Sequence, residues 1–171
     1  MTYTAPIPRF LDIEYCESGD GIFPTAMAWS LEDGRMKVVV IEPDEDWLPE
    51  EGDSVEVDVR YLMEQGVPLV ELARALHEDL PNETVYVDGL DPDDELLEMI
   101  FDAVGMEQPF ETAPVAELLT GVARSDIEDA RQTLIFDEGL DPRLPETGVY
   151  ALLLLAQQAG LVERGEQTDD L

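Results

Sequence analysis

Three apolar segments open the chain and predict strands. Residues 9–14 (RFLDIE) are apolar except where two carboxylates emerge, and residues 22–31 and 36–41 form two further apolar runs. Asp33 and Gly34, between the second and third runs, are typical of a tight hairpin turn. The first quarter of the chain therefore predicts three strands, of which the last two form a hairpin.

Helical spacing follows. Six apolar residues between Val67 and Leu80 recur every three or four positions, and residues 96–104 repeat that spacing after a short strand at 83–88. Residues 114–122, 126–136 and 149–161 predict further helices. Strands first and alternating strands and helices later favour an α/β fold, with a mixed sheet and helices packed on its faces.

The length of 171 residues suits one domain, here expected to span 1–171 with a short disordered acidic tail from about residue 164. No apolar run approaches the roughly 18 residues of a membrane helix. The N-terminus carries no signal-peptide pattern, and the single cysteine, Cys16, excludes an internal disulfide. We expect a cytoplasmic protein without membrane contact; its oligomeric state stays open.

Charge changes this picture most. The chain has 41 acidic and 9 basic residues, which gives a formal net charge of −32, and Lys37 is its one lysine. Three explanations are open: adaptation to high salt (a halophilic surface), mimicry of nucleic acid toward a DNA-binding protein, and plain acidity. Under each of them, binding to a phosphate backbone at low salt is expected to be poor.

Asp12 and Glu14 are the first candidates for a catalytic or metal-binding site. Residues i and i+2 of a strand point to the same face, so the two carboxylates lie side by side on an apolar strand. Such a pair is costly to bury unless a positive group compensates it, and hard cations such as Mg²⁺ or Mn²⁺ prefer oxygen ligands. In so acidic a chain the same pattern also arises by chance.

The order of segments supplies a context for this pair. After Asp12-Ile13-Glu14 come a Pro-containing strand at 22–30, the turn at Asp33, the strand Val85-Tyr86-Val87-Asp88, then Asp93 and an amphipathic helix. This order resembles that of DEDD-type 3′-5′ exonucleases, which have a ribonuclease H-like fold.

The resemblance implies a mixed five-stranded sheet with three antiparallel strands first and parallel strands later. It implies Asp12, Glu14 and Asp93 as ligands of Mg²⁺ or Mn²⁺, with Asp88 lining the cleft. The implied activity is metal-dependent hydrolysis of nucleic-acid phosphodiesters from a 3′ end.

The last motif of that family departs from the pattern. Pro142 or Arg143 stands where the family has a histidine, and Thr147 or Gly148 stands where it has an aspartate. Glu146 is one or two positions away and is the candidate for the missing carboxylate. The one histidine, His77, lies in an earlier predicted helix, where a surface or core-edge role is expected.

Three functions follow from these residues. The first is an exonuclease-like protein in which catalysis is impaired or lost, and which binds a nucleic-acid 3′ end or a protein partner. The second is a working exonuclease that uses Asp12, Glu14, Asp93 and Glu146. The third is an acidic interaction protein or DNA mimic that uses the same fold without catalysis and binds a protein partner.

Overall fold

A computed structural model describes residues 8–18, 21–48, 57–89, 92–119 and 122–159 of the chain. Five strands in this part form one sheet in the order β3-β2-β1-β4-β5. β1, β2 and β3 are antiparallel, whereas β4 runs parallel to β1 and β5 runs parallel to β4. The predicted fold class, a mixed five-stranded sheet that begins antiparallel, is confirmed. The strands are β1 (Arg9–Ser18), β2 (Gly21–Ser30), β3 (Met36–Val40), β4 (Thr84–Val87) and β5 (Glu111–Pro114).

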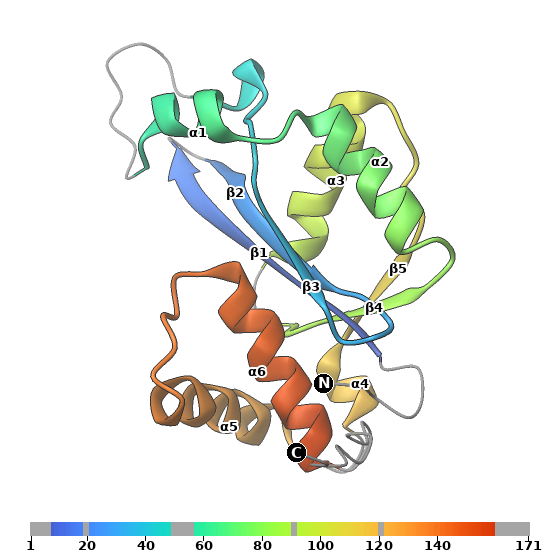
Figure 1. Cartoon of the computed structure of the whole chain (residues 1–171), viewed down its shortest axis with the longest axis vertical. Coiled ribbons are helices and arrows are strands. Elements are labelled where there is room, and N and C mark those ends of the chain that lie inside the picture. Colours follow the sequence, from blue (N-terminus) through green and yellow to red (C-terminus); the bar gives the residue numbers. More distant parts are fainter. Residues whose placement is uncertain (1–7, 19–20, 49–56, 90–91, 120–121, 160–171) are drawn as a thin grey trace, which may run out of the picture.

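Helices cover both faces of the sheet (Figure 1). α2 and α3 lie on one face, and α6 crosses the other face with α5 packed beside it. None of the described helices combines the length and apolarity needed to span a membrane. The helices are η1 (Glu45–Trp47), α1 (Val59–Gln65), α2 (Leu69–Asp79), α3 (Asp93–Val104), α4 (Val115–Leu118), α5 (Arg124–Asp137) and α6 (Pro145–Gln158).

The alternation of side chains along β1 divides the interior into two cores. Leu11 and Ile13 belong to the core beneath α2 and α3, whereas Phe10 belongs to the core beneath α6 together with Leu152. Asp12 lies two residues beyond Phe10, so it faces α6 rather than α2. The strand therefore buries a carboxylate on the face that α6 covers.

Several predicted boundaries differ from the structure. β5 and α1 were not located in the sequence, because a four-residue strand and a seven-residue helix are too short for a periodic signal. The helix expected over 149–161 begins at Pro145, a residue favoured in the first turn. The predicted helix at 114–122 is the single turn of α4 among its described residues. The predicted tail from about 164 lies outside the described residues.

A buried tryptophan ties the sheet to α2. The Trp29 indole is fully buried, and its Nε1 donates a hydrogen bond of 2.9 Å to Asp79 Oδ2. Lys37, which pairs with Trp29 across β2 and β3, places its Nζ 2.7 Å from the same oxygen. Asp79 thus satisfies both the buried indole and the lysine.

Replacing Asp79 by alanine should lower the free energy of unfolding by about 1–3 kcal/mol, because the buried indole N–H loses its acceptor. Urea denaturation measures the change. Asp102→Ala is the matched control, since Asp102 is an exposed aspartate of α3. Equal stability of the two variants would contradict the role assigned to Asp79.

Candidate functional site: a buried carboxylate cluster

Strand register brings two aspartates level with each other. In the parallel ladder of β1 and β4, Phe10 pairs with Tyr86. Two residues further along each chain are Asp12 and Asp88, whose side chains point to the same face as that pair. Both carboxylates are buried, at 4% and 5% exposure. Asp12 of β1 and Asp88, which directly follows β4, therefore lie side by side.

A third aspartate reaches the same point from α3. The chain turns after β4 with Gly89 at φ 81°, a conformation that favours glycine, and α3 begins at Asp93. Asp93 is 1% exposed. One carboxylate oxygen from each of Asp12, Asp88 and Asp93 lies within 4.8 Å of the others. We call these three residues the aspartate cluster.

α6 closes the cluster from the other side. A Cβ atom added at Gly148 would lie 2.4 Å from Asp12 Oδ2, closer than real Cβ contacts come. Gly148 is buried near the start of α6, where glycine is otherwise unfavourable. The lack of a side chain at this position lets the helix pack against Asp12. An isolated glycine in a helical pattern is the signal that could have located this contact.

Gly148→Ala should therefore destabilise the protein by about 1–3 kcal/mol, because α6 must shift away from the cluster. Chemical denaturation measures the change. In the double variant Asp12→Ala/Gly148→Ala the two effects should be strongly non-additive, since the first substitution removes the nearest atoms. Additive effects would show that the contact does not limit packing.

One arginine approaches this acidic site. Arg131, on α5, has its Nη1 3.6 Å from Asp88 Oδ2, and its side chain is 18% exposed. Glu14 is half-buried, and burial raises the pKa of its carboxyl, whereas Arg131 and a hydrogen bond with Asp12 act in the opposite direction. Glu14 and Arg131 line a depression of about 550 Å³ together with Pro142. Sequence reasoning missed Arg131, because nothing in the predicted helix distinguished it.

Glu14→Gln should make stability less dependent on pH. An acid with a raised pKa in the folded state binds protons more tightly there than in the unfolded chain. The Glu14 carboxyl therefore contributes most to the stability of the folded state below the ordinary glutamate pKa of 4.5. This contribution is lost as pH rises through the higher pKa of the folded state. In EDTA, we expect Glu14→Gln to gain melting temperature relative to the unsubstituted protein between pH 4 and pH 7. A constant difference across this range would contradict the raised pKa.

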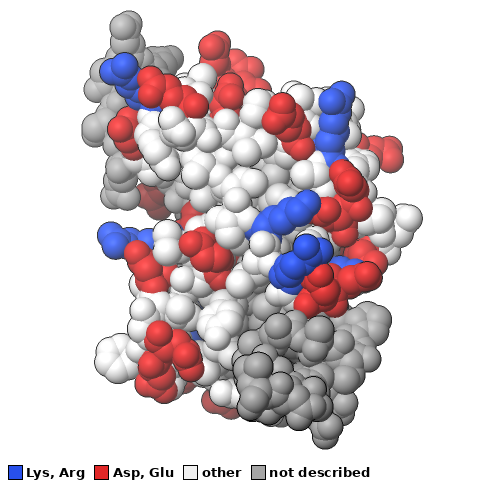
Figure 2. All heavy atoms as spheres, viewed as in Figure 1, with Lys and Arg blue, Asp and Glu red and all other residues white. Residues whose placement is uncertain are grey.

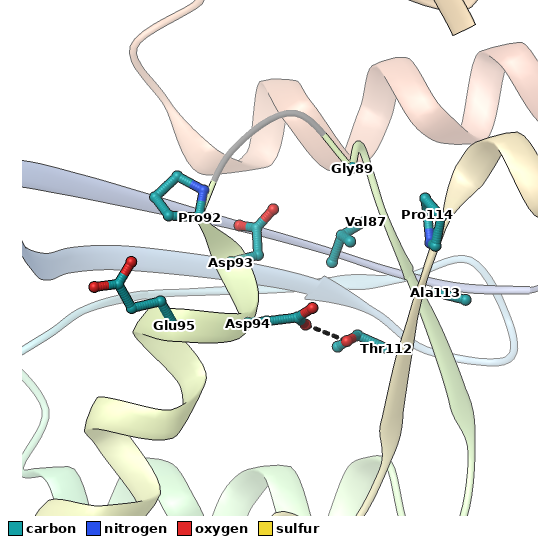
Figure 3. Close-up of a pocket in the computed structure, with 9 residues that line it drawn as sticks. All are labelled: Val87, Gly89, Pro92, Asp93, Asp94, Glu95, Thr112, Ala113 and Pro114. Carbon is teal, nitrogen blue, oxygen red and sulfur yellow. Dashed lines mark hydrogen bonds between the residues drawn. The ribbon is translucent and has the colours of Figure 1, made fainter.

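A second cavity, of about 430 Å³, lies beside the cluster at the start of α3 (Figure 3). Asp93 lines it together with apolar residues of β4 and β5 such as Val87 and Pro114. Asp94, the next residue of α3, accepts a hydrogen bond from the Thr112 hydroxyl across the cavity. The two successive acids therefore have different surroundings, since Asp93 is buried and Asp94 is exposed.

The predicted site residues are only partly brought together. Asp12 and Asp93 lie in the cluster, with Asp88 as the third member in the described part of the chain. Glu14 lies beside Asp12 but outside this group. Glu146 is on the first turn of α6, and its Oε2 is buried without a hydrogen-bond partner among the described residues. It does not belong to the group of three.

The single histidine lies elsewhere. His77 is on α2, where its Nε2 is 2.8 Å from the carbonyl oxygen of Glu107, and its ring meets that of Phe101 edge-on at 6.1 Å. These contacts join α2 to the end of α3. They give His77 a structural role at the edge of the core.

No protein-family model matches the sequence, and no curated protein matches it. Among solved structures, the chain is similar to one from the crystal of a yeast NOT1 MIF4G domain co-crystallized with CAF1. The TM-score is 0.59 at 11% identity, and the match covers 92% of this chain and 81% of that chain. A likeness at this identity shows the fold alone.

These comparisons correct the exonuclease prediction. No family model or curated relative supports a DEDD-type exonuclease, and the similar structure is described by a MIF4G domain and its protein partner, not by a nuclease activity. The chain is therefore not assigned to that family, and the expected nuclease and hydrolase activities are withdrawn. The physical reason is that an order of short acidic motifs is weak evidence of function in a chain with 41 acids, because one fold serves many functions.

Proposed function

We propose that this protein is an acidic interaction protein that binds a protein partner with a basic surface, and that its fold serves binding rather than catalysis. The observation that carries the proposal is the imbalance of charge on a folded domain. The chain has 41 acids for 9 bases. Acidic side chains are spread over the face drawn in Figure 2, and Lys and Arg side chains lie beside them at several places.

Intramolecular ion pairs occupy most of the basic residues in the described part of the chain. Among the residues that the structure describes, six basic ones form ion pairs with acids of the same chain. Their charge is thus largely neutralised within the molecule, and the remaining surface presents mainly carboxylates. Such a surface steers a basic partner toward it and repels nucleic acid. The six residues are Arg9, Arg35, Lys37, Arg60, Arg131 and Arg143.

The comparison with solved structures supports a protein partner in a general way. A chain of similar fold comes from a crystal that contains a NOT1 MIF4G domain and CAF1. That the proposed partner is basic is inferred from the net negative charge of this chain and not from the comparison.

The test is binding to a purified partner. The tagged full chain would be used to capture proteins from its source cells, and each captured protein would be purified and titrated by calorimetry. We expect a basic protein that binds with defined stoichiometry, and at least ten-fold more weakly at 0.5 M than at 0.1 M KCl. Competition by double-stranded DNA would identify the partner as a DNA-binding protein and the chain as a mimic.

Two results would overturn this proposal. One is that no purified protein binds with defined stoichiometry at either salt concentration. The other is a partner that is acidic and binds with the same affinity at both concentrations.

A second proposal concerns the aspartate cluster, where we infer a site for Mg²⁺ or Mn²⁺. Three buried carboxylate oxygens within 4.8 Å of one another suit a hard cation in kind and number. Opposite oxygen ligands of Mg²⁺ are about 4.2 Å apart, so any pair of oxygens near the 4.8 Å limit would move inward to share one ion. An ion bound at this point would offset the repulsion among Asp12, Asp88 and Asp93. Arg131 of α5 approaches Asp88 in this cluster.

A further inference from the structure

We propose that the outer face of α5, with Phe136 as its anchor, is the surface that docks the basic partner. This inference rests on the function proposed above and names the part of the molecule that carries it. The proposed occupant is a basic protein surface with an apolar socket for one aromatic ring.

α5 is the outermost helix of its layer. Its inner face carries Ile127, Ala130 and Leu134, which pack in the core beneath α6. These residues are spaced three and four positions apart, so they form one stripe along the helix. Figure 1 shows α5 at the lower edge of the molecule, beside α6.

The outer face of α5 combines an acid with one large apolar residue. Asp129 shares this face with Phe136, two turns away, and Phe136 is 85% exposed. Asp126 and Asp137 are exposed along the edge of the face. This is the highest exposure among the large hydrophobic residues described; the next is Tyr61 on α1, at 52%. Partial exposure of an aromatic residue is ordinary, but exposing nearly the whole ring of a phenylalanine forgoes about 1.5–3 kcal/mol of burial.

The acids around Phe136 identify the chemistry of the partner. Arginine and lysine would pair with Asp129 and Asp137, and an arginine can also stack on the face of the Phe136 ring. A second copy of this chain fits poorly, because it would bring the same acids together on two molecules of charge −32. Burial of the ring would also persist in high salt, where attraction between charges is screened.

Phe136→Ser is the decisive variant, with Tyr61→Ser as its control. Both side chains are exposed, so neither substitution should change the melting temperature by more than about 1 °C. In calorimetry with the purified basic partner, Phe136→Ser should weaken binding at least ten-fold, whereas Tyr61→Ser should leave it within two-fold.

A pair of charge variants tests the acids. The triple variant Asp126→Asn/Asp129→Asn/Asp137→Asn should slow association at least five-fold at 0.1 M KCl. A triple variant on the opposite layer removes the same charge and should have less than half of this effect. Its substitutions are Glu71→Gln, Glu98→Gln and Asp102→Asn, all at exposed positions.

The possible outcomes distinguish a failure of the α5 docking surface from a failure of the proposed interaction function. If the unsubstituted protein binds its partner and Phe136→Ser binds equally well, the α5 surface is wrong and the interaction function stands. If no purified partner binds at all, the proposed function fails first. If light scattering shows a dimer that Phe136→Ser dissociates, the face joins two copies and the inference is overturned.

Discussion

The melting temperature should rise by about 10 °C or more when KCl increases from 0.1 to 2 M, since each kcal/mol of relieved repulsion moves it by about 2–4 °C. At 0.1 M salt the Debye length is about 10 Å, so neighbouring acids repel one another, and at 1 M it is about 3 Å. A chain of net charge −32 carries this repulsion over its whole surface. Differential scanning calorimetry in EDTA gives the measurement.

KCl is the appropriate salt because strongly excluded salts such as sulfate stabilise most proteins. The control is the same titration on a variant in which exposed acids are replaced by their amides, whose melting temperature should rise less. A flat or falling melting temperature in the unsubstituted protein would exclude adaptation to high salt. Mimicry and plain acidity would then remain as explanations of the charge.

The salt response also bears on the interaction proposal. A protein that works in molar salt cannot use long-range attraction, because charges beyond a few ångströms are screened. Its partner would then be held by direct ion pairs and by burial of an anchor such as Phe136. A protein that works in dilute salt would gain a fast association rate from the same acids.

The sequence was most informative where a pattern is long and repeated. The apolar strands at 9–14, 22–31 and 36–41 were located correctly, and the alternation along the first of them placed Asp12 beside Glu14 on one face. Their antiparallel order followed in part from the hairpin at Asp33. These features depend on neighbours in sequence, which is why pattern alone identifies them.

The site was harder to predict because it depends on register. The resemblance implied Asp88 in the cleft, but its position beside Asp12 depends on the pairing of Phe10 with Tyr86, which no local pattern specifies. Arg131 comes from a helix more than a hundred residues away from Asp12. The exonuclease assignment was wrong for a related reason, since the spacing of acids says little about function in so acidic a chain.

Adding Mn²⁺ should raise the melting temperature of the unsubstituted protein, and Asp93→Asn should remove this response. A ligand at about one hundred times its dissociation constant stabilises the folded state by about 2.7 kcal/mol, and each kcal/mol moves the melting temperature by about 2–4 °C here. Without metal, Asp93→Asn should melt above the unsubstituted protein, because the substitution removes one of three carboxyls that crowd together in a buried site. Adding Mn²⁺ should therefore reverse the order of the two melting temperatures, so that the unsubstituted protein melts above Asp93→Asn.

Asp94→Asn is the matched control, since it makes the same aspartate-to-asparagine substitution at the next residue of the same helix. Asp94 is exposed and hydrogen-bonded to Thr112, outside the cluster, so this variant should keep the full response to Mn²⁺. Surface acids also attract Mn²⁺, and 0.5 M KCl in every sample screens that weaker binding. Electron paramagnetic resonance then counts the bound ion directly. If Asp93→Asn keeps its bound Mn²⁺ and its thermal shift, the ion lies elsewhere, and the three buried aspartates do not form a metal site.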